Sequence, residues 1–135
     1  MTAMNDNQRM TAQACLEGAE ANTLTFPQII GKLMGAGFES YTVDFRRQAA
    51  TYYLPDGESV EFMIHKITAP VAETFNPRSL QEAIREAQQM VPGYTYKGFC
   101  KKAVAAGCAG YVVSFSGRRA LYIGRTAETH VEYFP

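Results

Sequence analysis

The sequence has few of the features that mark a particular biochemical class. Its 135 residues carry 13 basic and 13 acidic side chains, so there is no net charge to attract nucleic acid or acidic substrates. No apolar run approaches the roughly 20 residues of a membrane span, and the first ten residues, MTAMNDNQRM, lack the basic and apolar regions of a signal peptide. No strong catalytic, metal-binding or nucleotide-binding motif occurs. We therefore expect a cytoplasmic protein without a cofactor.

Cysteines are also scarce. The three present, Cys15, Cys100 and Cys108, are an odd number without the C-x-x-C spacing of a metal or redox site. This usage suits a reducing compartment better than a disulfide scaffold. Apolar surroundings favour burial of all three in the core. The two histidines show no ligand spacing relative to them, so no metal site is expected.

The composition is that of an ordinary globular protein, with 47% hydrophobic and 19% charged residues. We expect one domain, residues 1–135, with a sizeable core. The charge is uneven, because the first 91 residues hold 7 basic and 11 acidic side chains and the rest hold 6 and 2. This asymmetry is compatible with head-to-tail association of two copies, and equally with a solvated surface.

The clearest signal is an internal repeat, seen when the chain is aligned with itself so that Thr25 falls on Thr95. Ten pairs are identical without a gap: Thr25/Thr95, Lys32/Lys102, Ala36/Ala106, Gly37/Gly107, Tyr41/Tyr111, Val43/Val113, Phe45/Phe115, Ala50/Ala120, Tyr52/Tyr122 and Glu58/Glu128. After a one-residue insertion, the match resumes with 60–62 against 131–133. Chance gives about two identities over such a stretch, so we interpret the repeat as an internal duplication.

Each copy carries the signals of a helix followed by strands. Thr25 and Thr95 are predicted N-caps, and Gly37 and Gly107 are predicted helix stops. Alternation of apolar and polar residues with period two then predicts three strands in each half.

A further helix precedes each of these units. In the second half, Ser79 and Glu82 form a predicted capping box. The full unit therefore reads α-α-β-β-β twice. The two copies span about 6–67 and 79–135, and residues 68–78 form the linker between them.

These patterns predict an α+β fold with helices packed on one face of an antiparallel sheet of about six strands. Two related halves are expected to pair about a pseudo-two-fold axis. The alternative arrangement is two three-stranded sheets that face each other.

The alternation assigns the strand side chains to two faces. Residues shared by both halves lie on one face and are interpreted as helix-facing core, with pocket lining by the matched tyrosines as the alternative. The opposite face differs between the halves. In the first half it is predicted to carry Thr42, Asp44, Thr51, Tyr53, Glu61, Met63 and His65. In the second half it is predicted to carry Val112, Ser114, Leu121, Ile123, His130 and Glu132.

One hypothesis places a small amphipathic ligand on this second face, between a polar and an apolar wall. Its binding residues would be Thr42, Asp44, Thr51, Tyr53, Glu61 and His65. The competing interpretation is a solvated face in the first half and a protein contact in the second.

Asp44, Tyr53 and His65 are the weak candidates for catalysis, since a carboxylate that orients a histidine beside a phenol can perform acid–base chemistry. Polar surface is the competing interpretation. Pairs of arginines occur at the predicted turns, at 46–47 and 118–119. Positive charges of this kind bind the phosphate groups of nucleic acids. No recognition helix or aromatic platform accompanies them, so nucleic-acid binding is not expected.

The segments TFPQIIGKLMGAGFESYTVDF and TYYLPDGESVEF, followed by a second helix–hairpin unit ending in Tyr-Phe, carry a family resemblance. This order is similar to that of the YbcV/YdfO-like family of small bacterial and prophage proteins, sometimes labelled phage envelope proteins. The resemblance spans the chain from about residue 10 to the end. It implies a duplicated α+β fold, a bacterial or phage origin and a domain of unknown function, and it supplies no catalytic residues.

The preferred hypothesis is a non-enzymatic module that binds a protein or a small ligand and forms a homodimer. One alternative is a small enzyme that uses Asp44, His65 and Tyr53. A second alternative is a phage regulatory protein that contacts nucleic acid.

Overall fold

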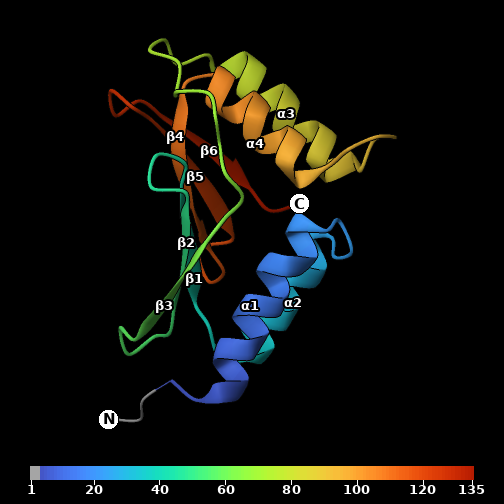
Figure 1. Ribbon diagram of the computed structural model, residues 1–135, viewed down its shortest axis with the longest axis vertical. Coiled ribbons are helices and arrows are strands. Elements are labelled where there is room, and N and C mark those ends of the chain that lie inside the picture. The colour runs from blue at the N-terminus through green and yellow to red at the C-terminus, as the bar shows by residue number, and fades with distance from the viewer. Residues whose placement is uncertain (1–3) are drawn as a thin grey trace.

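The computed structural model describes residues 4–135 and shows an α+β fold with four helices and one six-stranded antiparallel sheet (Figure 1). The elements in chain order are α1 (Asp6–Glu20), α2 (Phe26–Gly35), β1 (Ser40–Asp44), β2 (Ala49–Tyr53), β3 (Ser59–Met63), α3 (Pro77–Gln89), α4 (Tyr96–Ala105), β4 (Cys108–Ser114), β5 (Arg119–Gly124) and β6 (Thr129–Tyr133). The strand order in the sheet is β3-β2-β1-β4-β5-β6. This confirms the predicted fold class.

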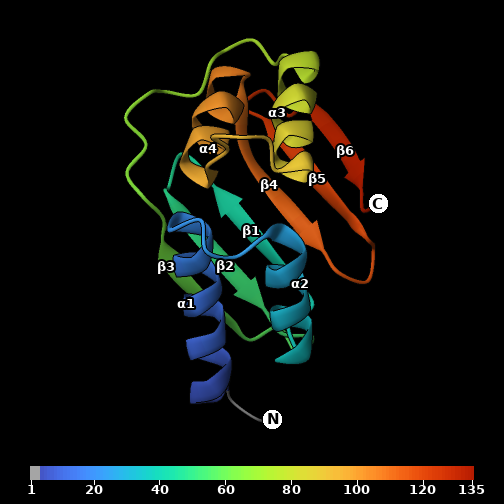
Figure 2. The same ribbon diagram turned by 90° about the vertical axis from the view of Figure 1, so that its right-hand side faces the viewer.

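All four helices lie on one face of the sheet. The pair α1 and α2 covers one end of this face and the pair α3 and α4 covers the other, as Figures 1 and 2 show. The opposite face of the sheet is not covered by any helix in the described part of the chain. The two halves therefore share one continuous sheet, and the alternative of two facing sheets is wrong.

The two halves meet where β1 pairs with β4. In this antiparallel pair, Thr42 lies opposite Val112, its own counterpart in the repeat. The same pairing sets Tyr41 opposite the counterpart of Val43, and Val43 opposite the counterpart of Tyr41. A pseudo-two-fold axis therefore passes between Thr42 and Val112, as expected for two similar halves. The common evolutionary origin of the halves remains a prediction.

Local sequence signals explain the helix–strand junctions. Thr25 and Thr95 cap α2 and α4 by accepting hydrogen bonds from backbone N–H groups in the first turn, at 3.3 and 3.0 Å. After these helices, Gly37 and Gly107 take φ values of +99° and +86°, which glycine adopts without the steric cost of a side chain. The matched residues of the repeat thus occupy matched positions in the fold.

One predicted helix cap is wrong. Helix α3 begins at Pro77, and its N-cap is Asn76, whose side chain accepts a hydrogen bond from the backbone N–H of Ser79 at 3.1 Å. Ser79 is therefore inside the first turn. Proline at the first helical position has a suitable φ and needs no hydrogen-bond partner for its nitrogen, which favours the earlier start.

The predicted one-residue insertion before the third strand is also wrong. Tyr52 pairs with Val60, and its counterpart Tyr122 pairs with His130, so the offset that relates Thr25 to Thr95 continues unchanged through β3 and β6. The match of 60–62 to 131–133 was based on identical residues. The hydrogen bonds of the sheet instead place 60–62 in the positions that correspond to 130–132. A shift of one residue moves every side chain of a strand to the other face.

This change of register corrects the predicted position of two side chains. His130 and Glu132 lie on the helix side of the sheet, because their cross-strand partners Tyr122 and Ala120 are buried there. The open face of β6 instead presents Thr129, Val131 and Tyr133.

The core lies between the helices and the sheet, and contains all three cysteines, as predicted. The linker packs against α4 through Val71, which is buried, and through a hydrogen bond from the Ala72 N–H to the Val104 carbonyl at 3.1 Å. Over residues 4–135, no helix combines the length and the apolar character needed to span a bilayer.

Candidate functional site

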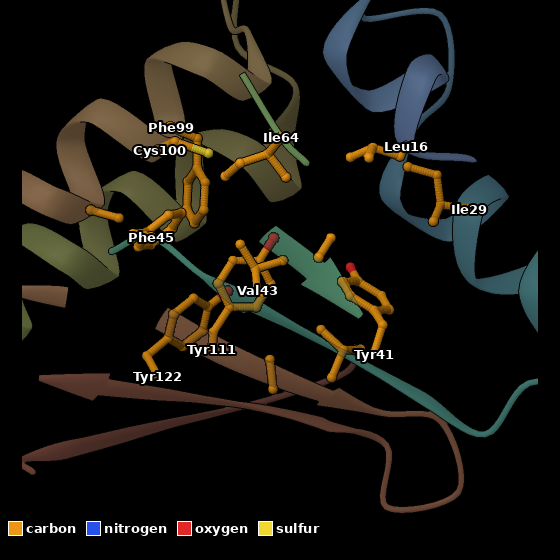
Figure 3. Close-up of a cluster of buried hydrophobic side chains, with 14 of the residues drawn as sticks. Leu16, Ile29, Tyr41, Val43, Phe45, Ile64, Phe99, Cys100, Tyr111 and Tyr122 are labelled. Atoms are coloured by element: carbon orange, nitrogen blue, oxygen red, sulfur yellow. The ribbon is translucent and has the colours of Figure 1, made fainter. Parts of the chain in front are cut away.

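A cavity of about 340 Å³ lies between the helix layer and the sheet. Both helical pairs contribute to its walls, including Leu16 and Ile29 from the first pair and Phe99 from the second. Figure 3 shows these side chains facing one another above the sheet. The volume is within the range of about 300–1,000 Å³ of small-molecule sites.

Four tyrosines form the floor of the cavity, and all four belong to the matched pairs of the repeat. Tyr41 and Tyr52 are cross-strand neighbours on β1 and β2, with ring centroids 5.4 Å apart. Their counterparts Tyr111 and Tyr122 have centroids 5.2 Å apart. Figure 3 shows Tyr41, Tyr111 and Tyr122 rising from the sheet towards the helices. The cavity thus has an aromatic floor placed across the pseudo-two-fold axis.

The tyrosine hydroxyls differ in their hydrogen bonding. The Tyr111 hydroxyl bonds the hydroxyl of Tyr96, on α4, at 2.8 Å. The hydroxyls of Tyr41, Tyr52 and Tyr122 form no hydrogen bond within residues 4–135, although these residues are only 7%, 3% and 7% exposed. The structure leaves no fully buried polar side-chain atom without a partner among the described residues, so these three oxygens keep some accessible surface, and all three residues line the cavity. A ligand in the cavity would meet three free hydroxyl groups.

Burial also determines the protonation of these tyrosines. Loss of hydration raises the pKa values of Tyr41, Tyr52, Tyr111 and Tyr122 above the ordinary range of a phenol. All four are therefore neutral at physiological pH and act as hydrogen-bond donors as well as acceptors. Burial likewise raises the pKa of the Cys15 thiol in the cavity wall, although the nearby Lys32 opposes this shift.

The C-terminal segment forms one side of the cavity. Phe134 packs edge-on against Phe26 at the start of α2, with ring centroids 5.7 Å apart, and both residues line the cavity. A hydrogen bond of 2.9 Å from the Tyr96 N–H to the side chain of Asn22 joins the α1–α2 loop to the start of α4. The two helical pairs are thus linked directly at the cavity rim.

One charged side chain lines the cavity, Glu132 on β6. Its carboxylate lies 2.9 Å from His130 Nε2, and the two side chains are 21% and 18% exposed. Sequence reasoning missed Glu132 as a cavity residue, because the assumed insertion placed both Glu132 and His130 on the open face. An unchanged repeat offset through β6 is the signal that would have found it.

The structure does not bring the three catalytic candidates together. Asp44 and Tyr53 lie at opposite ends of the β1–β2 hairpin, four residue positions or about 13 Å apart. His65 follows the end of β3 and lies on the helix side, where its ring nitrogen is 2.9 Å from Glu20 and its ring contacts Tyr96. The predicted shared face of His65 is therefore wrong, because strand alternation stops when pairing ends at Met63.

Asp44 has a structural role at the hairpin turn. Its carboxylate accepts hydrogen bonds from the backbone N–H groups of Arg46 and Arg47, at 3.0 and 3.1 Å. The counterpart Ser114 accepts from the Gly117 N–H at 3.0 Å in the second half. The aspartate and serine that differ between the copies thus perform the same turn-capping function.

The other predicted ligand residues, Thr42, Thr51 and Glu61, lie on the open face with Asp44 and Tyr53. Neither these five nor His65 lines the cavity. Glu61 instead forms an exposed ion pair with Arg47 at 2.8 Å.

The two arginine pairs lie at opposite ends of the sheet, because β1 and β4 run antiparallel. They therefore do not form a single basic patch. Among residues 4–135 there is also no cluster of three potential ligands for a metal ion.

The comparison with curated proteins finds no match to this chain. A family model described as "Protein of unknown function (DUF1398)" matches residues 15–132, which include nearly all of the sheet and part of α1. The match covers the cavity floor, the four tyrosines and Glu132. The chain therefore belongs to the DUF1398 family, a family of unknown function.

Proposed function

We propose that this protein is a binding module for a small, largely apolar ligand that occupies the cavity between the helical pairs. The observation that carries this proposal is a set of three tyrosine hydroxyls in the cavity lining that form no hydrogen bond to another described residue and keep accessible surface. Hydroxyls with accessible surface in a largely apolar site are free to bond water or the polar group of a ligand. A ligand with a polar group would supply the missing partners.

The shape of the site supports the same proposal. A hollow of about 340 Å³ with aliphatic and aromatic walls exposes apolar surface to water, and a bound ligand would cover that surface and stabilise the folded protein. No catalytic group assembles in this cavity from the sequence candidates, so binding without reaction is the function that we propose.

Native mass spectrometry of the purified protein, followed by titration with the neutral fluorescent probe N-phenylnaphthylamine, tests this function. We expect either a retained ligand mass or saturable binding of one probe molecule. Ala120→Leu adds a larger side chain on the cavity floor and should weaken the probe about tenfold or more.

Val112→Leu is the matched control, because Val112 lies on the open face of the neighbouring strand. It should leave probe binding unchanged. The proposal is contradicted if the probe does not bind and no ligand is retained, or if both variants weaken binding equally.

A second candidate function, self-association, is favoured by the open face of the sheet. Met63, Val131 and Tyr133 lie on it and are 66%, 39% and 63% exposed. We propose that two copies pack through this face as a homodimer, with the acidic first half of one over the basic second half of the other. Dimer formation that weakens with salt supports this arrangement, and a monomer at all salt concentrations refutes it.

A further inference from the structure

The cavity lining has an unusual charge balance. Among the residues that line it there is one carboxylate side chain, Glu132, and no lysine, arginine or histidine. An anionic ligand would therefore lose its hydration without gaining a cationic partner in the lining, because His130, which does not line the cavity, is paired with Glu132. The lining itself thus disfavours carboxylates and phosphates.

Glu132 also breaks the symmetry of the two halves at this site. It lies opposite Ala120, whereas the corresponding residue in the first half, Phe62, lies opposite Ala50. Both alanines line the cavity, as does Glu132, whereas Phe62 does not. The second half therefore places a carboxylate at the cavity where the first half places no charged side chain.

The aromatic floor favours the same ligand charge. Tyrosine faces attract cations through the negative potential of the ring. The two tyrosine pairs and Phe99 place several such rings around the cavity. Glu132 lies close enough to Tyr122 for its charge to help raise that phenol's pKa, after the larger effect of burial.

We propose that the cavity selects an amphipathic amine, with its apolar body among the helices and its ammonium group at Glu132 and the tyrosine rings. This inference rests on the proposed function, and it adds the charge of the ligand. The free tyrosine hydroxyls then bind the polar substituents or the ordered water that accompany the amine. His130, which pairs with the same carboxylate on the rim, holds Glu132 in place.

The test uses three probes of similar shape: phenylbutylamine, phenylbutanol and phenylbutyrate. Isothermal titration calorimetry with the full-length protein should rank them as amine, alcohol and carboxylate, with about a tenfold step between the first two. Glu132→Gln should lower the affinity of the amine to that of the alcohol and leave the alcohol unchanged. Glu61→Gln, an exposed carboxylate on the open face, is the matched control and should change none of the three.

The outcomes separate the two proposals. Binding of the alcohol as tight as that of the amine, or preferential binding of the carboxylate, overturns the charge preference and leaves the binding function standing. Failure of all three probes to bind contradicts the cavity as a ligand site, and the charge preference with it. Equal loss of amine affinity in Glu132→Gln and Glu61→Gln also overturns the assignment of the ammonium group.

Discussion

Removing single tyrosine hydroxyls from equivalent positions of the two halves should have opposite effects on stability. Tyr41 and Tyr111 are repeat counterparts with almost the same exposure, 7% and 6%. The Tyr111 hydroxyl shares a hydrogen bond with Tyr96, whereas the Tyr41 hydroxyl has no partner among the described residues. The phenylalanine variants therefore remove the same atom from nearly the same environment, with and without a hydrogen bond.

Tyr111→Phe should lower the free energy of unfolding by about 1–2 kcal/mol, because it breaks one hydrogen bond and leaves the Tyr96 hydroxyl without a partner. Tyr41→Phe should leave the free energy of unfolding unchanged or raise it by up to about 1 kcal/mol, because it removes an unpaired polar group from an apolar site. If the hydroxyl serves a ligand, the same Tyr41→Phe variant should bind the cavity probes less tightly. A gain in stability with a loss of binding is typical of a residue kept for function.

Urea unfolding followed by circular dichroism measures both effects, provided that the m value is the same in all variants. Tyr53→Phe, on the open face, is a control that should change neither stability nor probe affinity by a measurable amount. If Tyr41→Phe lowers the free energy of unfolding as much as Tyr111→Phe, the Tyr41 hydroxyl is hydrogen-bonded within the folded protein. The cavity would then offer no free hydroxyl at Tyr41 to a ligand, which contradicts the proposed site.

Three other perturbations test the fold around the cavity. Gly107→Ala should cost more than about 2 kcal/mol of unfolding free energy, because φ is +86° and the added Cβ collides with the carbonyl oxygen of Thr74. In Gly37→Ala the added Cβ meets only the Gln8 side chain, at 3.4 Å, so this variant should lose about 1 kcal/mol of unfolding free energy. Equal losses for the two glycine variants in urea unfolding would refute the predicted difference. Asp44→Ala should cost about 1 kcal/mol through loss of the turn cap while leaving probe binding intact, and a loss of binding would restore its functional role. Stability should fall as the pH rises above about 9, because burial raises the pKa of the Cys100 and Cys108 thiols and of the cavity tyrosines above their values in the unfolded chain. Tyrosinate absorbance should appear together with unfolding, and its appearance in the folded protein would contradict the burial.

Much of the fold could be predicted because its signals are local. The caps at Thr25 and Thr95, the stops at Gly37 and Gly107 and the alternation of the strands each depend on residues within a few positions of one another. The repeat also predicted that the two halves have the same order of helices and strands, although their contacts were not known. These features placed the matched tyrosines on the helix side of the sheet.

The predicted ligand residues on the strands lie on the face of the sheet opposite the cavity, for a physical reason. Alternation separates the two faces of a strand but does not show which face encloses a cavity. The halves differ on the open face, for example at Asp44 and its counterpart Ser114, and this difference suggested a ligand site there. In the structure both residues cap turns. The match of identical residues also predicted the wrong register for β6, and it therefore assigned Glu132 to the open face instead of the cavity side.

Short-range periodicity and capping specify the two α-α-β-β-β units, their helix ends and the inward face of the strands, so these features follow from the amino-acid order. The pairing of β1 with β4, the contact of His65 with Glu20 and the cavity between the helical pairs become visible only in the folded chain. These features depend on hydrogen-bond register and packing between segments that are far apart in the chain. Such contacts are set by the balance of many side chains at once, which no local pattern records.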